Sequence, residues 1–261
     1  ARDTNEITSK VLIRDQKNSR ADHYYAARET DANFLRVSTE GNGTEYDRNL
    51  FYRGVGYLDA PLIVSMSDDE RILTLASNSI EPMAHLFVVT VQRGLMRYQK
   101  VKQVARTMST EVDLNVEGFG AHRDVSVQLM REVAAALVQE GLYEREARAM
   151  VETWKDQWFT ENGTRVLYVL PRAWTDRNLP IEISPAPHKI VRVMVGRSEV
   201  ITPTQERELE RHILSYATGD PIAMERATEA ARELHLGRFM MPAARLALAI
   251  RLSWAWPRRV P

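Results

Sequence analysis

Arg53 is the charged side chain with the most unusual sequence surroundings in this chain. It lies in residues 50–56 (LFYRGVG), where aromatic and apolar neighbours predict a strand. A guanidinium in apolar company needs a carboxylate beside it, and Glu29 and Asp31 are the nearest acids in a strand-like region. We therefore name Arg53 and Glu29 as candidate binding residues. Whether Arg53 pairs within the fold or binds a carboxylate or phosphate ligand stays open.

Residues 118–124 (GFGAHRD) form a second candidate site, because the glycines lead into a predicted helix. Backbone amides near His122 and Arg123 could hold an anion at that helix N-terminus. Asp124 could cap the same helix instead. We name His122 and Arg123 as candidate binding residues and keep capping by Asp124 as the alternative.

Several familiar chemistries have no support in the sequence. The chain has no cysteine, which excludes disulfides, thiolate metal sites and a cysteine nucleophile. Its six histidines never show the i, i+2 or i, i+4 spacing of a local metal motif, and serine-hydrolase and P-loop motifs are missing. The acidic turn at residues 68–70 could bind a cation or be a solvated hairpin tip. We predict no catalytic residues, no metal and no cofactor.

The tryptophans fall into two groups. Trp154 and Trp158 lie one helical turn apart on an apolar stripe, which favours core packing for both over stacking on a sugar or another flat ligand. Trp254 and Trp256 stand beside two arginines near the end of the chain. Such an aromatic and basic segment could dock on its own domain or on a partner. We name Trp254 and Trp256 as candidate binding residues and leave both alternatives open.

The composition is that of an ordinary globular protein. With 44% hydrophobic and 27% charged side chains among 261 residues, the chain can bury one large core or two modest ones. The 35 basic residues, six lysines and 29 arginines, balance 35 acidic ones, so there is no electrostatic footprint for nucleic acid or an anionic membrane. No uncharged apolar run reaches the about 18 residues of a transmembrane helix. Peripheral membrane association stays open.

The first third of the chain is predicted to be strand-rich. Short β-rich runs alternate with the Gly, Pro, Asn and Asp that tight turns require. The runs are residues 10–13, 22–28, 33–38, 49–55, 61–66, 71–77, 84–92 and 95–101. Together they favour an antiparallel sandwich or barrel between about residue 10 and about residue 115.

The pattern becomes helical after residue 118. Apolar residues recur every fourth position from Val125 to Leu137, and Gly141 follows as a left-handed cap. A second apolar stripe at residues 147–158 predicts the other helix of a hairpin.

Strands are predicted again after the helical hairpin. Residues 164–171 are apolar on both faces, which indicates a central strand, and residues 188–202 alternate like a strand. The proline-rich residues 179–187 connect them, and helices are expected at 202–214, 220–236 and 242–256. The sequence thus predicts an α+β fold with two domains. Residues 1–118 would form a β-rich sandwich-like domain, and residues 119–261 an α+β domain with the hairpin and C-terminal helices.

Several segments resemble those of an uncharacterised group of exported bacterial proteins. The similar segments, spread over most of residues 20–205, are residues 26–37, 50–56, 137–159, 163–171 and 191–203. Members of that group follow an export signal with β-rich sequence and then an α+β region. The resemblance implies an extracytoplasmic location, periplasmic or secreted, and a longer precursor. The chain begins without Met, which fits a processed export product or a shortened chain. The resemblance implies no activity.

Two classes of function remain from the sequence. The leading hypothesis is a non-enzymatic extracytoplasmic component that acts in protein interaction or envelope assembly, with a protein partner or as a homo-oligomer. The rival is a hydrolase or small-ligand-binding protein with a non-local site around Arg53 and His122, joined by Glu29 and His85. A small-ligand carrier with a cavity between sandwich and helices is a third reading.

Overall fold

The computed structural model describes residues 24–39, 43–51, 58–106 and 108–217, with short pieces at 54, 220–222, 225–226 and 229. The chain has an α+β fold, as predicted. Its described helices are the 3₁₀ helix η2 (Ala26–Arg28), α2 (His122–Gln139), α3 (Glu144–Phe159), α4 (Arg172–Asn178) and α5 (Pro203–Ala217). Its described strands are β1 (Leu35–Thr39), β2 (Gly43–Asp47), β3 (Leu62–Met66), β4 (Ile72–Ser77), β5 (Met83–Gln92), β6 (Leu95–Val104), β7 (Ser109–Asp113), β8 (Gly120–Ala121), β9 (Gly163–Val169) and β10 (Val195–Val200).

The largest sheet has five strands in the order β10-β9-β5-β6-β8, and every neighbouring pair is antiparallel. Strands β5 and β6 are joined at Arg93 and Gly94, whose φ angles of 50° and 77° suit a two-residue hairpin turn. Strand β9 lies between β10 and β5 and is buried from Arg165 onward, which confirms the predicted central strand. The sheet therefore joins strands from both sides of residue 118, where we expected a domain boundary.

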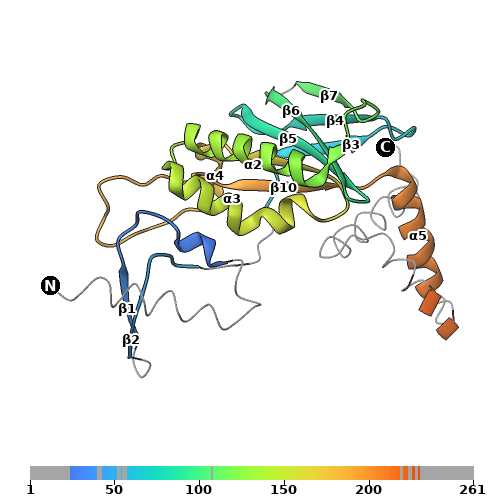
Figure 1. The fold of residues 1–261 in the computed structure, drawn as a ribbon. Helices are drawn as coiled ribbons and strands as arrows, with labels where there is room; N and C mark the ends of the chain where they lie inside the picture. The colour runs from blue at the N-terminus through green and yellow to red at the C-terminus, as the bar shows by residue number, and fades with distance from the viewer. Residues whose placement is uncertain are drawn as a thin grey trace, which may run out of the picture.

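The large sheet is covered on both faces. Because side chains alternate along a strand, Leu86 and Val88 pack on the smaller sheet β3-β4-β7, whereas Phe87 and Val89 pack against α2 and α3. Figure 1 shows α2 and α3 lying side by side across the sheet, and the β1–β2 hairpin standing away from this body. The two packed sheets form a sandwich, as predicted, and neither sheet closes into a barrel within the described strands.

Two parts of the N-terminal region differ from the sequence prediction. Residues 22–28 are predicted as a strand, but Ala26–Arg28 form η2, and the Nε of Arg28 donates to the Asp47 carboxylate of β2 at 2.9 Å. Leu50 and Phe51, predicted to begin a strand, lie outside the strands and are exposed.

Helix α4 and the start of β10 also differ from the prediction. The sequence did not reveal α4, because seven residues are too few for an apolar period to stand out. Strand β10 begins only at Val195, although the alternating pattern starts near residue 188. Residues 188–194 run beside α4 instead, where the carbonyl of Ile190 accepts a hydrogen bond from Arg172.

Gly196 on β10 lies directly opposite Tyr168 on β9, and the buried Tyr168 ring covers it. A Cβ at Gly196 would lie 2.3 Å from Cζ of Tyr168. We therefore expect Gly196→Ala to lower the free energy of unfolding by about 1–3 kcal/mol, measured by urea denaturation. Gly54→Ala is the matched control, because a Cβ there meets nothing within 4 Å. Equal effects of the two substitutions would contradict the close approach.

A paired carboxylate at Glu81 predicts a pH dependence. Arg177 on α4 donates to both Glu81 oxygens, at 2.7 and 2.9 Å, and these hydrogen bonds lower the pKa of Glu81 from 4.5 to about 2. A pKa lowered in the folded state stabilises the protein above pH 4.5, and this stabilisation is lost as the pH falls from 4.5 to about 2. In Arg177→Gln, the Glu81 pKa measured by NMR should rise toward 4.5. An unchanged pKa would show that Arg177 is not its cause.

Candidate functional site

Helices α2 and α3 form an antiparallel hairpin on the large sheet. Gly141, with a φ of 109°, reverses the chain after α2, as the sequence predicts. The Tyr143 N–H then donates to the Glu146 carboxylate at 3.0 Å and closes the first turn of α3. The predicted inward stripes are confirmed, with these residues buried: Leu129, Val133, Leu137, Ala147, Val151 and Trp158.

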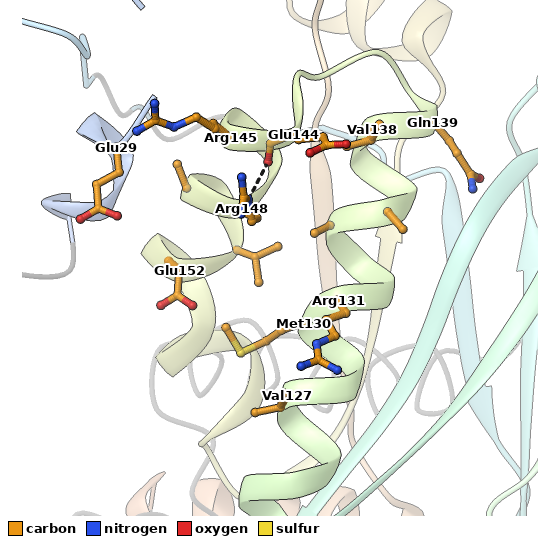
Figure 2. Close-up of a pocket in the computed structure, with 14 residues that line it drawn as sticks. Glu29, Val127, Met130, Arg131, Val138, Gln139, Glu144, Arg145, Arg148 and Glu152 are labelled. Carbon is orange, nitrogen blue, oxygen red and sulfur yellow. Dashed lines mark hydrogen bonds between the residues drawn. The ribbon is translucent and has the colours of Figure 1, made fainter. Parts of the chain in front are cut away.

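The outward side of the same hairpin holds a groove of about 1010 Å³. It follows α2 from Val127 to Gln139 and α3 from Glu144 to Glu152. In Figure 2, the Met130 side chain extends from α2 toward α3 across this space. The floor is apolar and largely made of small side chains, from Val127, Met130, Ala134, Ala135, Val138, Ala149 and Val151.

Charged side chains of both signs surround the apolar floor of the groove. They are Glu29, Arg131, Glu144, Arg145, Arg148 and Glu152. Arg145 pairs with Asp31, and Glu152 pairs with Lys155 at 2.9 Å, all with solvent-exposed side chains. The described residues provide no ion pair for the other four, although the Nε of Arg148 donates to the main-chain oxygen of Glu144 at 3.4 Å (Figure 2). An apolar channel with such a rim suits a polypeptide segment that carries both charge signs.

Glu29 is the one sequence candidate that lines this groove. It directly follows η2, which packs on α3, where Tyr24 meets Trp154 edge-on with ring centroids 6.1 Å apart. Figure 2 shows Glu29 on the α3 side of the groove. The other acid that we considered for Arg53, Asp31, pairs with Arg145.

His122 and Arg123 lie at the N-terminal end of α2, whereas Glu29 lies at the other end of the groove (Figure 2). The His122 Nε2 donates to the carbonyl oxygen of Phe159 at 2.6 Å, so the imidazole binds a free carbonyl at the C-terminal end of α3. Arg123 is exposed. The N-cap residue is Ala121 and makes no side-chain cap hydrogen bond, so Asp124 lies in the first turn without capping the helix.

His85 does not share a site with His122. It occupies an irregular position in β5, with a φ of 55°, and its Nε2 lies 3.3 Å from Glu140 at the end of α2. The 18 residues of α2 span about 27 Å at about 1.5 Å per residue, and the two histidines lie at opposite ends. The structure thus separates two members of the rival site. Its third member, Arg53, lies outside the described residues, as do Trp254 and Trp256.

The acidic turn at residues 68–70 has a structural role. Glu70 accepts a hydrogen bond from the Thr204 N–H at 2.9 Å, and hydrogen bonding with Thr204 lowers the pKa of Glu70. This bond ties the first turn of α5 to the β3–β4 hairpin. Asp69 accepts hydrogen bonds from Ser67 and from the Arg71 N–H. Over the described ranges we find no cluster of His, Asp and Glu able to hold a metal ion, and no helix long and apolar enough to cross a membrane.

Arg165 is fully buried and closes the end of α3. Its Nε lies 3.3 Å from Glu199, and its terminal nitrogens donate to the carbonyl oxygens of Trp158, Glu161 and Asn162 at 3.2, 2.6 and 3.1 Å. Burial lowers the pKa of Arg165, and the Glu199 carboxylate opposes this shift. With its charge and donors satisfied, Arg165 is a structural residue.

Sequence reasoning missed every groove residue except Glu29. The signal was present, because Val127, Ala134 and Val138 repeat at helical spacing beside the stripe that faces the sheet. Alanine and methionine also pack well inside a core, so the pattern alone did not mark an outward face.

The comparisons with known proteins add no assignment to this geometry. No protein-family model matches the chain, and neither the curated proteins nor the solved structures contain a significantly similar one.

The buried position of Arg165 predicts a large effect of its removal. Arg165→Met should lower the free energy of unfolding by roughly 3–5 kcal/mol, because three carbonyls lose their donor and Glu199 loses a partner. In the matched control, Arg145→Met, the exposed pair with Asp31 should contribute less than about 1 kcal/mol. Urea denaturation measures both values. Similar losses in the two variants would show that the buried network is no stronger than a surface pair.

Proposed function

We propose that this chain is a protein-interaction component of a larger extracytoplasmic assembly, and that it binds an aliphatic peptide segment of a protein partner in the α2–α3 groove. The observation that carries this proposal is the apolar floor between two neighbouring helices, where Val127, Ala135 and Val138 of α2 are exposed. A helix surface that remains apolar in solvent is typical of a binding surface.

The shape and charge of the groove favour a polypeptide over a compact small molecule. From Val127 to Val138, α2 runs for about 16 Å at about 1.5 Å per residue. The small side chains of Ala134, Ala135 and Ala149 leave room along this length for branched side chains. The three glutamates and three arginines around it can pair with charges of both signs on the bound segment.

The extracytoplasmic setting rests on different support. It comes from the resemblance of scattered segments to exported bacterial proteins. The groove itself gives no information about the cellular compartment. The rival activity, a site around Arg53 and His122, gains nothing from His122, whose ring binds the carbonyl of Phe159.

A crosslinking experiment tests the groove directly. Because the chain has no cysteine, Ala135→Cys gives a single thiol in the groove for a photoactivatable crosslinker. We expect this probe to form a defined adduct with a protein in envelope extracts of the source cells. A probe at Ala173→Cys, an exposed alanine on α4, is the matched control and should form none.

Competition shows whether the adduct depends on the groove. Excess unlabelled wild-type chain should suppress it, whereas a Val138→Asp chain should compete at least tenfold less well, because a carboxylate then replaces an apolar side chain of the floor. Equal competition by the two chains, or equal labelling from Ala135→Cys and Ala173→Cys, would overturn the proposed function.

A further inference from the structure

Loop 180–189, between α4 and β10, is exposed along its whole length. Its two isoleucines, Ile181 and Ile183, are 42% and 46% exposed. A single exposed aliphatic residue is ordinary, but this pair stands in a loop that the rest of the fold holds firmly at both ends.

Two arginines and one carboxylate clamp the base of the loop. Arg192 donates to Asp176 at 2.8 Å and to the carbonyl of Leu179 at 2.6 Å. Arg172 donates to the same Asp176 at 2.9 Å and to the carbonyl of Ile190 at 2.7 Å. The residue just before the loop and the residue just after it are therefore bound to one ion cluster.

Prolines restrict the loop between these anchors. Pro180, Pro185 and Pro187 have a fixed φ, and each favours an extended conformation of the residue before it. A clamped, proline-rich loop loses little conformational entropy when it binds. These are the properties of a segment that is presented to a binding surface.

We propose that loop 180–189 of one copy of this chain binds in the α2–α3 groove of a second copy. This inference rests on the proposed function, because it takes the groove as a peptide-binding site and names its occupant. The contact is between copies because the loop is fully exposed and clamped outside its own groove.

The loop and the groove match in length and side-chain size. Pro180 to Ser184 spans about 13 Å when extended, at about 3.3 Å per residue, and fits within the run of α2 along the groove; the chain bends after it, at the cis Ser184–Pro185 bond. The branched side chains of Ile181 and Ile183 suit a floor that includes three alanines.

The charges of the loop and the groove are also complementary. Glu182 lies between the two isoleucines, and the groove offers Arg131 and Arg148. Lys189 follows at the end of the loop, and the groove offers Glu29 and Glu144. None of these four groove side chains has an ion-pair partner within the described chain, so the second copy would neutralise their charges.

The base of the loop adjoins the end of the groove. A Cβ on Gly141 would lie 3.3 Å from Cγ1 of Val191, so the turn between α2 and α3 contacts the chain just after the loop. Tyr143 at this turn is 78% exposed, and tyrosine is frequent in interfaces. A twofold axis beside this end would bring both loops to both grooves at once, as a closed dimer requires.

Disulfide trapping tests the proposed pair of surfaces. The chain has no cysteine, so Ile183→Cys and Ala135→Cys each give a single thiol. Mixed under mild oxidation, the two variants should form a linked heterodimer, because a disulfide requires Cα atoms about 4.4–6.8 Å apart. The matched control is Ile183→Cys mixed with Ala121→Cys, an exposed alanine at the far end of α2. Equal linking in the two mixtures would overturn the proposal.

Sedimentation provides an independent measurement. The wild-type chain should dimerise, and Ile181→Asp with Ile183→Asp should weaken the dimer at least tenfold while circular dichroism stays unchanged. His188→Ala, on the same exposed loop, should leave the dimer intact. A wild-type chain that remains monomeric at about 100 µM would overturn the inference.

The outcomes separate this inference from the proposed function. If the Ala135 probe crosslinks a different protein and the chain is monomeric, the groove binds a partner and the loop proposal is wrong. If the probe crosslinks residues 1–23 of its own chain, a segment of the same chain occupies the groove and both proposals are wrong. A dimer whose thiols at Ile183 and Ala135 do not link would use another surface and would also overturn the inference.

Discussion

The buried guanidinium of Arg165 is the interaction on which the rest of this structure depends. It projects from β9, where its charge is balanced by Glu199 of β10, and it binds three carbonyl oxygens at the end of α3. His122 and Arg197 bind two more carbonyls at the same helix end, so α2 and β10 are joined to it as well. This one cluster therefore anchors the C-terminal end of α3 to the sheet and to α2, the helix that forms the other side of the groove.

Arginine bound to main-chain carbonyls recurs through the fold. Arg97 donates to the carbonyls of Leu114 and Val116 and stacks on Phe119, which holds the segment that leads into α2. Arg172 and Arg192 hold both ends of loop 180–189 in the same way. A guanidinium offers five donors in a planar fork, so it can bind a carboxylate and a nearby carbonyl together, which an ammonium does less well. Arg97, Arg172 and Arg192 thus have a structural use in this chain.

Helix α2 explains why the molecule has an open groove with an apolar floor. One face packs on the large sheet through Leu129, Val133 and Leu137, and the adjacent outward face is apolar as well. A helix that is apolar over so much of its circumference is normally covered on both sides. Here α3 covers this face only in part. Small side chains, among them Ala134, Ala135 and Ala149, leave the groove open between the two helices. Packing on the sheet and lining of the groove therefore use different faces of the same helix.

The sequence by itself determined the elements whose signal is local. The stripe from Val125 to Leu137, the cap at Gly141 and the apolar run of β9 all depend on neighbours in the chain, and each was predictable. Only the tertiary structure decided that β9 and β10 complete a sheet begun by β5 and β6, that Glu29 lies on a groove, and that His85 and His122 lie far apart. The physical reason is that strand pairing and side-chain partners join residues distant in sequence, and periodicity carries no information about which of them will meet.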